Sequence, residues 1–156
     1  MDNKEINAEQ AYSKMAHLCS RSEQCSADIR KKILAYEIVD EIVEEIIDKL
    51  IEEKYIDDER YVKAYVNDKF KINKWGKVKM RHYLRLKGLS DEVIQKGLNN
   101  IDTEKYKNLL IKTMKTKAKT IKSKNKFDKM GQVIRFAQNR GFEPELIHRY
   151  MNITIE

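Results

Sequence analysis

Residues that could carry out chemistry are few and scattered along this chain of 156 residues. The histidines His17, His82 and His148 lie far apart, and none has a second histidine at metal-ligand spacing. The cysteines Cys19 and Cys25 are spaced neither as a CxxC redox site nor as a zinc knuckle. We therefore expect two free thiols, no metal site and no cofactor.

A group of charged residues, Asp57, Asp58 and Arg60, has the functional groups of an acid–base site. Two carboxylates and an arginine at a helix start do not form such a site without a cleft, so we interpret Asp57 as a helix cap. Arg60 is expected to fasten the junction between two helical groups. Gly76-Lys77 lacks the preceding glycine and following hydroxyl residue of a phosphate-binding loop. These observations argue against an enzyme.

The net charge of +7 is distributed unevenly along the chain. Residues 1–59 contain 8 basic and 16 acidic residues, whereas residues 60–129 contain 21 basic and 6 acidic residues. Residues 130–156 are balanced. A net charge of −8 followed by one of +15 predicts that the middle of the chain meets an anionic partner.

The first part of this basic region predicts a binding surface on one helix. Lys77, Arg81 and Arg85 are spaced by four residues, so they share one helix face. A solvated surface would look similar, and Arg81 could be structural, because Arg30 is its counterpart in the repeat described below. The indole of Trp75 could stack on a base or fill a gap between helices. The partner-binding residues expected here are Lys74, Trp75, Lys77, Arg81, Arg85 and Lys87.

The second part, residues 103–129, holds ten lysines against only Glu104 and Asp128. A helix so rich in one charge repels itself, and an anionic partner would offset the repulsion. The partner could be a nucleic-acid backbone, whose phosphates lysines neutralise without reading sequence, or an acidic protein groove. Solubility alone is a third interpretation. The binding residues expected here are Lys112, Lys115 and Lys119.

An internal repeat predicts the elements that position these residues. Residues 29–43 match residues 80–94 at a constant offset of 51, and the pattern returns 53 residues later in 133–147. Each copy reads as three helices, which gives repeats at 8–56, 57–102 and 103–152. The predicted helices span 8–20, 26–36, 40–53, 58–72, 76–87, 91–99, 103–121, 126–140 and 144–152.

Residues typical of helix ends support these boundaries. Gly88 and Gly141 suit the left-handed conformation that follows a helix, and Pro144 suits a first helical turn. Polar residues stand where N-terminal caps are needed, namely Ser26, Asp40, Asp57 and Ser90. Five aromatic residues fall mostly on apolar stripes and are expected in the core: Tyr55, Tyr61, Tyr65, Phe70 and Tyr83.

The predicted fold class is all-α, an elongated, curved array of three tandem three-helix repeats. A unit of about 50 residues is marginal alone, and stacking lets each unit bury a second face. A compact nine-helix bundle with incidental repeats is the alternative.

Three segments together resemble the RecX family. Residues 50–66, LIEEKYIDDERYVKAYV, are similar to the most characteristic stretch of the family. Residues 74–88 match the basic-Gly-basic start and the Lys-Gly end of a family helix. Residues 26–33 match the family's Ser-to-Arg-x-Lys pattern. Glu37 departs from the family, which often has glycine at that helix end. The resemblance implies structural roles for Asp57, Asp58, Arg60, Tyr61, Ala64, Gly76 and Gly88.

The resemblance also implies a function. RecX proteins bind the recombinase RecA, alone and as a filament on single-stranded DNA, lie in the filament groove, and suppress ATP hydrolysis, strand exchange and co-protease activity. They restrain recombination and the damage response without a catalytic site. We accordingly expect a cytoplasmic monomer with no membrane contact and at most a weak direct contact with DNA. A stand-alone nucleic-acid-binding helical module is the alternative.

Overall fold

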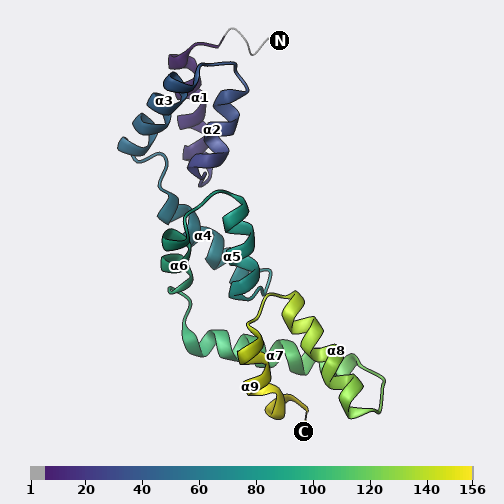
Figure 1. The fold of residues 1–156 in the computed structure, drawn as a ribbon. Helices are drawn as coiled ribbons and strands as arrows, with labels where there is room; N and C mark the ends of the chain where they lie inside the picture. Colours follow the sequence, from purple (N-terminus) through teal and green to yellow (C-terminus); the bar gives the residue numbers. More distant parts are fainter. Residues whose placement is uncertain (1–5, 156) are drawn as a thin grey trace. The chain divides into compact units, whose positions relative to one another are not determined.

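Nine α-helices and no strands make up residues 6–155, the part of the chain that this computed structural model describes (Figure 1). The helices are α1 (Ala8–Arg21), α2 (Ser26–Leu34), α3 (Asp40–Glu52), α4 (Asp58–Lys71), α5 (Lys77–Leu86), α6 (Asp91–Leu98), α7 (Thr103–Thr120), α8 (Lys126–Asn139) and α9 (Pro144–Ile155). Each begins within one residue of its predicted start. The predicted all-α class is confirmed, and the helix order is consistent with three groups of three.

The chain divides into two compact units. Unit 1 contains the residues up to Ala64 together with Leu84–Ile94, and unit 2 contains Tyr65–Tyr83 and the residues from Gln95 onward. The division passes through α4, α5 and α6, so each unit takes part of the middle helical group. The three separate repeats at 8–56, 57–102 and 103–152 remain a prediction.

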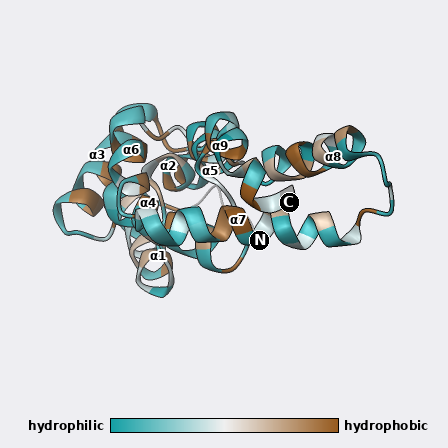
Figure 2. Cartoon of the chain, turned by 90° about the horizontal axis from the view of Figure 1, so that it is seen from below, coloured by the Kyte–Doolittle hydropathy of each residue, from teal (hydrophilic) through white to brown (hydrophobic). Residues whose placement is uncertain are grey.

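The core of unit 1 forms where the apolar stripes of α1, α2 and α3 meet. Ile29 and Ile33 lie one turn apart on α2, and Ile46, Ile47 and Leu50 follow helical spacing on α3. All five are almost completely buried, and each contributes about 1.5–3 kcal/mol by leaving water. Figure 2 shows apolar residues alternating with polar ones along the helices.

The core of unit 2 is organised around α7, which packs against both α8 and α9. Tyr106, Leu110 and Met114 follow one another at successive turns of α7 and are buried. Val133 from α8 and Ile147 from α9 complete the contact and are fully buried. The lysines of α7 therefore occupy the opposite, solvated side of an amphipathic helix.

Backbone geometry at the helix ends agrees with the sequence. Gly88 and Gly141 have φ values of +83° and +96°, in the left-handed region where glycine carries no steric penalty. Glu37 reaches the same region with φ 62°. This conformation explains why a glycine suits the position of Glu37.

Two predicted N-terminal caps are confirmed. Asp57 Oδ1 accepts a hydrogen bond from the Arg60 N–H at 3.1 Å, and Ser90 Oγ accepts one from the Val93 N–H at 3.2 Å. Each bond satisfies an amide that has no partner inside its helix. Pro144 opens α9, as predicted.

The predicted caps Ser26 and Asp40 are wrong. Ser26 is the first residue of α2, and its N–H and hydroxyl donate to the carboxylate of Asp58 at 2.9 Å and 2.7 Å. Asp58 thus caps α2 from 32 residues further along the chain, which no local pattern reveals. Asp40 is the first residue of α3, whose cap is Val39 with no side-chain bond.

The predicted burial of the five aromatic residues is wrong for Tyr55 and Tyr83, which are 36 % and 42 % exposed. Tyr61 and Tyr65 are half-buried, and the half-buried Phe70 packs against the core of unit 2. A tyrosine hydroxyl must reach water or a partner, so the tyrosine rings lie at the edges of their stripes.

Gly76 and Gly141 bring the start of α5 against the end of α8 inside unit 2. The Gly76 N–H donates to the Arg140 carbonyl at 2.7 Å, and the Val78 N–H donates to the Gly141 carbonyl at 2.9 Å. A Cβ on Gly76 would lie 2.4 Å from the carbonyl carbon of Gly141. No side chain fits at this contact.

Three further features bear on function classes. No described helix is both long and apolar enough to cross a membrane.

Within residues 6–155, no group of three histidine, cysteine or carboxylate side chains is placed to hold a metal ion. Cys19 and Cys25 are free thiols whose pKa values are raised by burial.

Candidate partner-binding surface

The three cations of the predicted α5 face each have a contact within the chain. Arg81 donates to Gln95 Oε1 at 2.5 Å, and Arg85 Nε pairs with Asp91 Oδ1 at 2.7 Å. Lys77 Nζ lies 4.9 Å from the centroid of the Tyr106 ring, a cation–π distance. The cations of this face therefore already make contacts within the chain, which leaves less of their charge for a partner.

The contact of Arg81 repeats a contact in the first helical group. Arg30 on α2 donates to both carboxylate oxygens of Glu44 on α3, at 2.6 Å and 3.1 Å. In both pairs the two residues are 14 apart, and the offset of 51 moves Arg30–Glu44 onto Arg81–Gln95. Each arginine joins the second helix of its group to the third. This equivalence favours the structural interpretation of Arg81.

Lys87 fastens the segment after α5 to the first turn of α2 within unit 1. Its Nζ pairs with Asp28 Oδ2 at 2.8 Å. The hydrogen bond to Asp28 raises the pKa of Lys87. This ion pair holds the lysine in place, so we expect Lys87 to contribute more to the fold than to a partner.

Trp75 is stacked inside its own helical group. Its ring lies 5.4 Å from that of Tyr83 at an interplanar angle of 30°. Lys69 Nζ and Lys79 Nζ lie 4.9 Å and 4.6 Å from the indole centroid. The indole therefore has one aromatic and two cationic partners inside the chain, which favours the gap-filling interpretation of Trp75 over base stacking.

A hollow of about 320 Å³ in unit 2 gathers cations that the sequence separates. Phe70 and Leu109 supply apolar atoms and Asn108 an amide. Its four lysines come from the end of α4, the following turn and α7: Lys71, Lys74, Lys105 and Lys112. We call this hollow the lysine groove.

The described lining of the lysine groove contains four lysines and no carboxylate. Among the described residues no carboxylate pairs with any of its four lysines. Lys74 is held by its own backbone, with φ 61° and with Nζ donating to the Lys71 carbonyl at 2.7 Å. Four ammonium groups around one hollow repel one another, and an anionic ligand would relieve that repulsion.

Other lysines of α7 lie outside the groove. Lys115 and Lys119, predicted to bind a partner, are exposed on the same helix. Lys107 and Lys117 lie over the rings of Tyr150 and Phe136, at 5.4 Å and 5.0 Å. Of the three predicted α7 residues, only Lys112 therefore lines the groove.

Tyr106 fixes the start of α5 from α7. Its hydroxyl accepts from the Lys77 N–H at 2.8 Å and donates to the carboxylate of Glu143. Burial and the bond to Glu143 raise the pKa of Tyr106. With the bonds of Gly76 and Val78, this satisfies the first amides of α5, so that helix end is not an open anion site.

Arg60 lies at the junction between the first two helical groups, which it was expected to fasten. Arg60 Nε pairs with Glu23 Oε2 at 2.6 Å, and its Nη2 donates to the carbonyls of Lys54 and Tyr55. These bonds hold the turn between α3 and α4 inside unit 1. Tyr61 and Ala64 follow on α4, and both are half-buried.

Sequence reasoning missed part of the groove. It identified Lys74 and Lys112, but not Lys71 or the apolar residues Phe70 and Leu109 beside them. The signal available was the basic last turn of α4 beside Phe70, a half-buried aromatic residue that packs against the core of unit 2 and also borders the groove.

Comparison with known proteins identifies the middle helices. Residues 57–98 match the family model described as "RecX, second three-helix domain". The chain is 33 % identical over 104 residues to the regulatory protein RecX of Clostridium tetani, and 28 % identical over 90 residues to that of Clostridium perfringens. The middle helices match the RecX family, and the chain is similar to RecX proteins over 65 % of its length.

The two matches cover 65 % and 56 % of this chain. The chain spans just under half the length of these curated RecX relatives, 47 % and 42 % respectively. Both relatives are named regulatory proteins.

Solved RecX structures share the fold. A crystal structure of regulatory protein RecX superimposes with a TM-score of 0.84 at 24 % identity, covering 93 % of this chain and 71 % of that one. RecX from Lactobacillus salivarius superimposes with a TM-score of 0.87 at 18 % identity, covering 94 % and 96 %. At these identities the likeness establishes the fold alone.

Proposed function

We propose that this chain is a RecX-type regulator that binds RecA, alone and as its filament on single-stranded DNA, and restrains ATP hydrolysis, strand exchange and co-protease activity. It acts as a binding protein in the cytoplasm, not as an enzyme. The observation that carries the proposal is the lysine groove, Lys71, Lys74, Lys105 and Lys112, in a chain whose curated relatives are regulatory proteins.

The groove supplies what docking on an acidic protein surface requires. Its lysines have no carboxylate partner among the described residues, so a partner's carboxylates would meet cations that are not already neutralised. Phe70 and Leu109 offer apolar contact beneath them. Such charge complementarity raises the association rate of two proteins and fixes their relative orientation more than it raises their affinity.

Regulation follows from bridging rather than from catalysis. A filament presents the same RecA surface many times, and a chain that contacts neighbouring subunits gains effective concentration at its second contact. Holding neighbours together opposes the subunit motions that accompany ATP turnover. The bound chain also occupies space that a second DNA strand needs.

The test measures RecA ATPase on single-stranded DNA with the purified chain. Inhibition by the wild-type chain is expected, and Lys105→Glu/Lys112→Glu should weaken it about tenfold by reversing two groove charges. The comparison variant is Lys115→Glu/Lys119→Glu, which makes the same charge change at the two predicted binding residues that lie outside the groove. It should inhibit like the wild type if the groove, rather than the whole lysine-rich face of α7, makes the contact. A wild-type chain without effect on ATPase would overturn the proposed function.

A second candidate function is binding of single-stranded nucleic acid without RecA. Phe127, at the start of α8, is 83 % exposed and stands in the stretch that contains Lys122, Lys124, Lys126 and Lys129. An exposed ring among cations suits base stacking beside phosphate contacts. Anisotropy of a labelled oligothymidylate, with the wild-type chain and Phe127→Ala, tests it. Tight, steeply salt-dependent binding without RecA would favour this candidate.

A further inference from the structure

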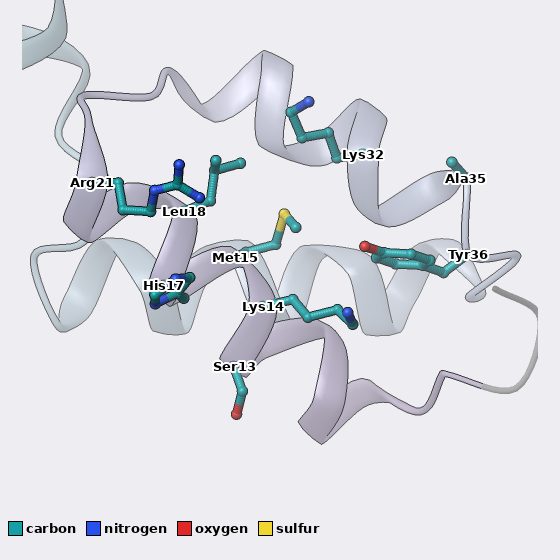
Figure 3. Close-up of a pocket in the computed structure, with 9 residues that line it drawn as sticks. All are labelled: Ser13, Lys14, Met15, His17, Leu18, Arg21, Lys32, Ala35 and Tyr36. Carbon is teal, nitrogen blue, oxygen red and sulfur yellow. The ribbon is translucent and has the colours of Figure 1, made fainter. Parts of the chain in front are cut away.

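A second hollow lies in unit 1, between α1 and α2, and has a volume of about 650 Å³ (Figure 3). Its apolar atoms come from Met15 and Leu18 on α1 and from Ala35 and Tyr36 after α2. Figure 3 shows the Met15 side chain pointing into the space between the two helices. We call this hollow the α1–α2 groove.

Cations line this groove, and carboxylates do not. Lys14 and Arg21 come from α1 and Lys32 from α2, and all three are exposed. His17 lies between the two α1 cations in sequence and also lines the groove. No aspartate or glutamate is among its described lining residues. The groove therefore combines an apolar surface with three permanent positive charges.

This positive charge stands in the most acidic part of the chain. Residues 1–59 have a net charge of −8, and the sequence of α3 alone, DEIVEEIIDKLIE, contains six carboxylates. Six of the 16 acids in residues 1–59 lie on α3, whereas three of the 8 cations line the groove, which has no carboxylate in its described lining. Separation of this kind creates a local positive potential that the net charge conceals.

We propose that the α1–α2 groove binds a short acidic segment of a partner protein, with an apolar side chain against Leu18 and Tyr36 and carboxylates toward Lys14, Arg21 and Lys32. This site is separate from the lysine groove. It requires neither RecA nor DNA, and it stands if the proposed function fails.

The acidic surroundings favour a short peptide over a nucleic acid. A long polyanion would run past the groove and approach the carboxylates of α3, which repel it. Screening at physiological salt limits that repulsion to about 8 Å, so a segment confined to the groove avoids most of it. The apolar lining holds one aromatic ring, Tyr36, and offers little surface for stacking successive bases.

The test titrates the full-length, isotope-labelled chain with a synthetic amphipathic peptide of repeated Glu-Leu-Leu-Glu units and follows amide chemical shifts. The amides of Met15, Leu18, Ala35 and Tyr36 should shift with this peptide. They should shift far less with a peptide of repeated Gln-Leu-Leu-Gln units. Lys14→Glu/Lys32→Glu should weaken binding about tenfold, because it replaces two attractions by two repulsions.

Lys31→Glu is the matched control, since Lys31 is exposed on α2 next to Lys32 but does not line the groove. A peptide of repeated Lys-Leu-Leu-Lys units should bind the Lys14→Glu/Lys32→Glu chain better than the wild-type chain. Equal shifts with the Glu and Gln peptides would overturn the proposal. So would tighter groove binding of an oligothymidylate, or concentration-dependent dimerisation that Lys14→Glu/Lys32→Glu abolishes.

Discussion

The two grooves have the same ingredients in opposite surroundings. Each has an apolar surface with lysines around it and no carboxylate among its described lining residues. The α1–α2 groove lies where the chain is acidic, whereas the lysine groove lies in the region of charge +15. The comparison teaches that the residues lining a groove favour an anionic ligand, whereas the charge of the surrounding surface limits how large that ligand can be.

Replacing Gly76 by alanine is expected to have the largest effect on stability. The variant also tests whether the α1–α2 groove of unit 1 still binds peptide when unit 2 is destabilised. The new Cβ would meet the Gly141 backbone at 2.4 Å, so the free energy of unfolding should fall by about 3 kcal/mol. Urea denaturation measures the loss. Gly131→Ala is the control, because its Cβ meets only the Arg135 guanidinium at 3.4 Å. Peptide binding at the α1–α2 groove should survive Gly76→Ala; its loss would show that the grooves are not independent.

Neutralising the lysine groove should weaken filament binding by about 30-fold at physiological salt. The variant Lys71→Gln/Lys74→Gln/Lys105→Gln/Lys112→Gln removes four exposed contacts, each of roughly 0.5 kcal/mol. Anisotropy at two ionic strengths should show that most of the salt dependence disappears with the lysines. A loss that is identical at both ionic strengths would refute an electrostatic role. Lys14→Gln/Lys32→Gln should leave filament affinity unchanged.

The tyrosine–glutamate pairs of the two units predict different alkaline behaviour. Tyr106 is buried and hydrogen-bonded to Glu143, so its pKa is raised, whereas a bond from Glu53 raises the pKa of the near-surface Tyr12 to about 12. A raised pKa stabilises the fold below the ordinary tyrosine value of about 10, and that contribution declines as pH rises toward the folded value.

Tyr106→Phe should therefore cost about 1–2 kcal/mol at neutral pH, because the Lys77 N–H loses its acceptor. The difference in free energy of unfolding between wild type and variant should shrink above about pH 10. Denaturation at pH 8 and at higher pH measures it. Tyr12→Phe should show a smaller effect. If the difference in free energy of unfolding between the wild type and Tyr106→Phe grows with pH, the predicted direction of the pH dependence is wrong.

The smallest expected effect compares the equivalent arginines. Arg30→Ala and Arg81→Ala should each reduce stability by about 0.5 kcal/mol, since both contacts are exposed. Thermal denaturation measures both variants. If Arg81→Ala instead abolishes filament binding at unchanged stability, Arg81 contacts the partner and its repeat equivalence is coincidental.

Much of the fold follows from local sequence. Gly88, Gly141 and Pro144 mark helix boundaries because their backbone preferences act at the residue itself, and the apolar stripe of α3 predicted which side packs. The Asp58–Ser26 bond could not be predicted, because it joins residues 32 apart that meet only after folding.

The candidate site was predictable only in part, for the same reason. Lys74 and Lys112 are conspicuous as charges, but their meeting with Lys71 and Lys105 depends on the packing of α4 and α7. The α1–α2 groove gave no sequence signal, because its cations Lys14, Arg21 and Lys32 are spread through an acidic segment.

The most direct test of the central claim is co-sedimentation of the chain with preassembled RecA filaments on single-stranded DNA. At physiological salt the chain should sediment with filaments to saturation and sediment much less with the same DNA alone. Lys105→Glu/Lys112→Glu should remain largely in the supernatant, whereas Lys115→Glu/Lys119→Glu should sediment like the wild type. Sedimentation with naked DNA equal to that with filaments, or none with either, would contradict a RecA regulator.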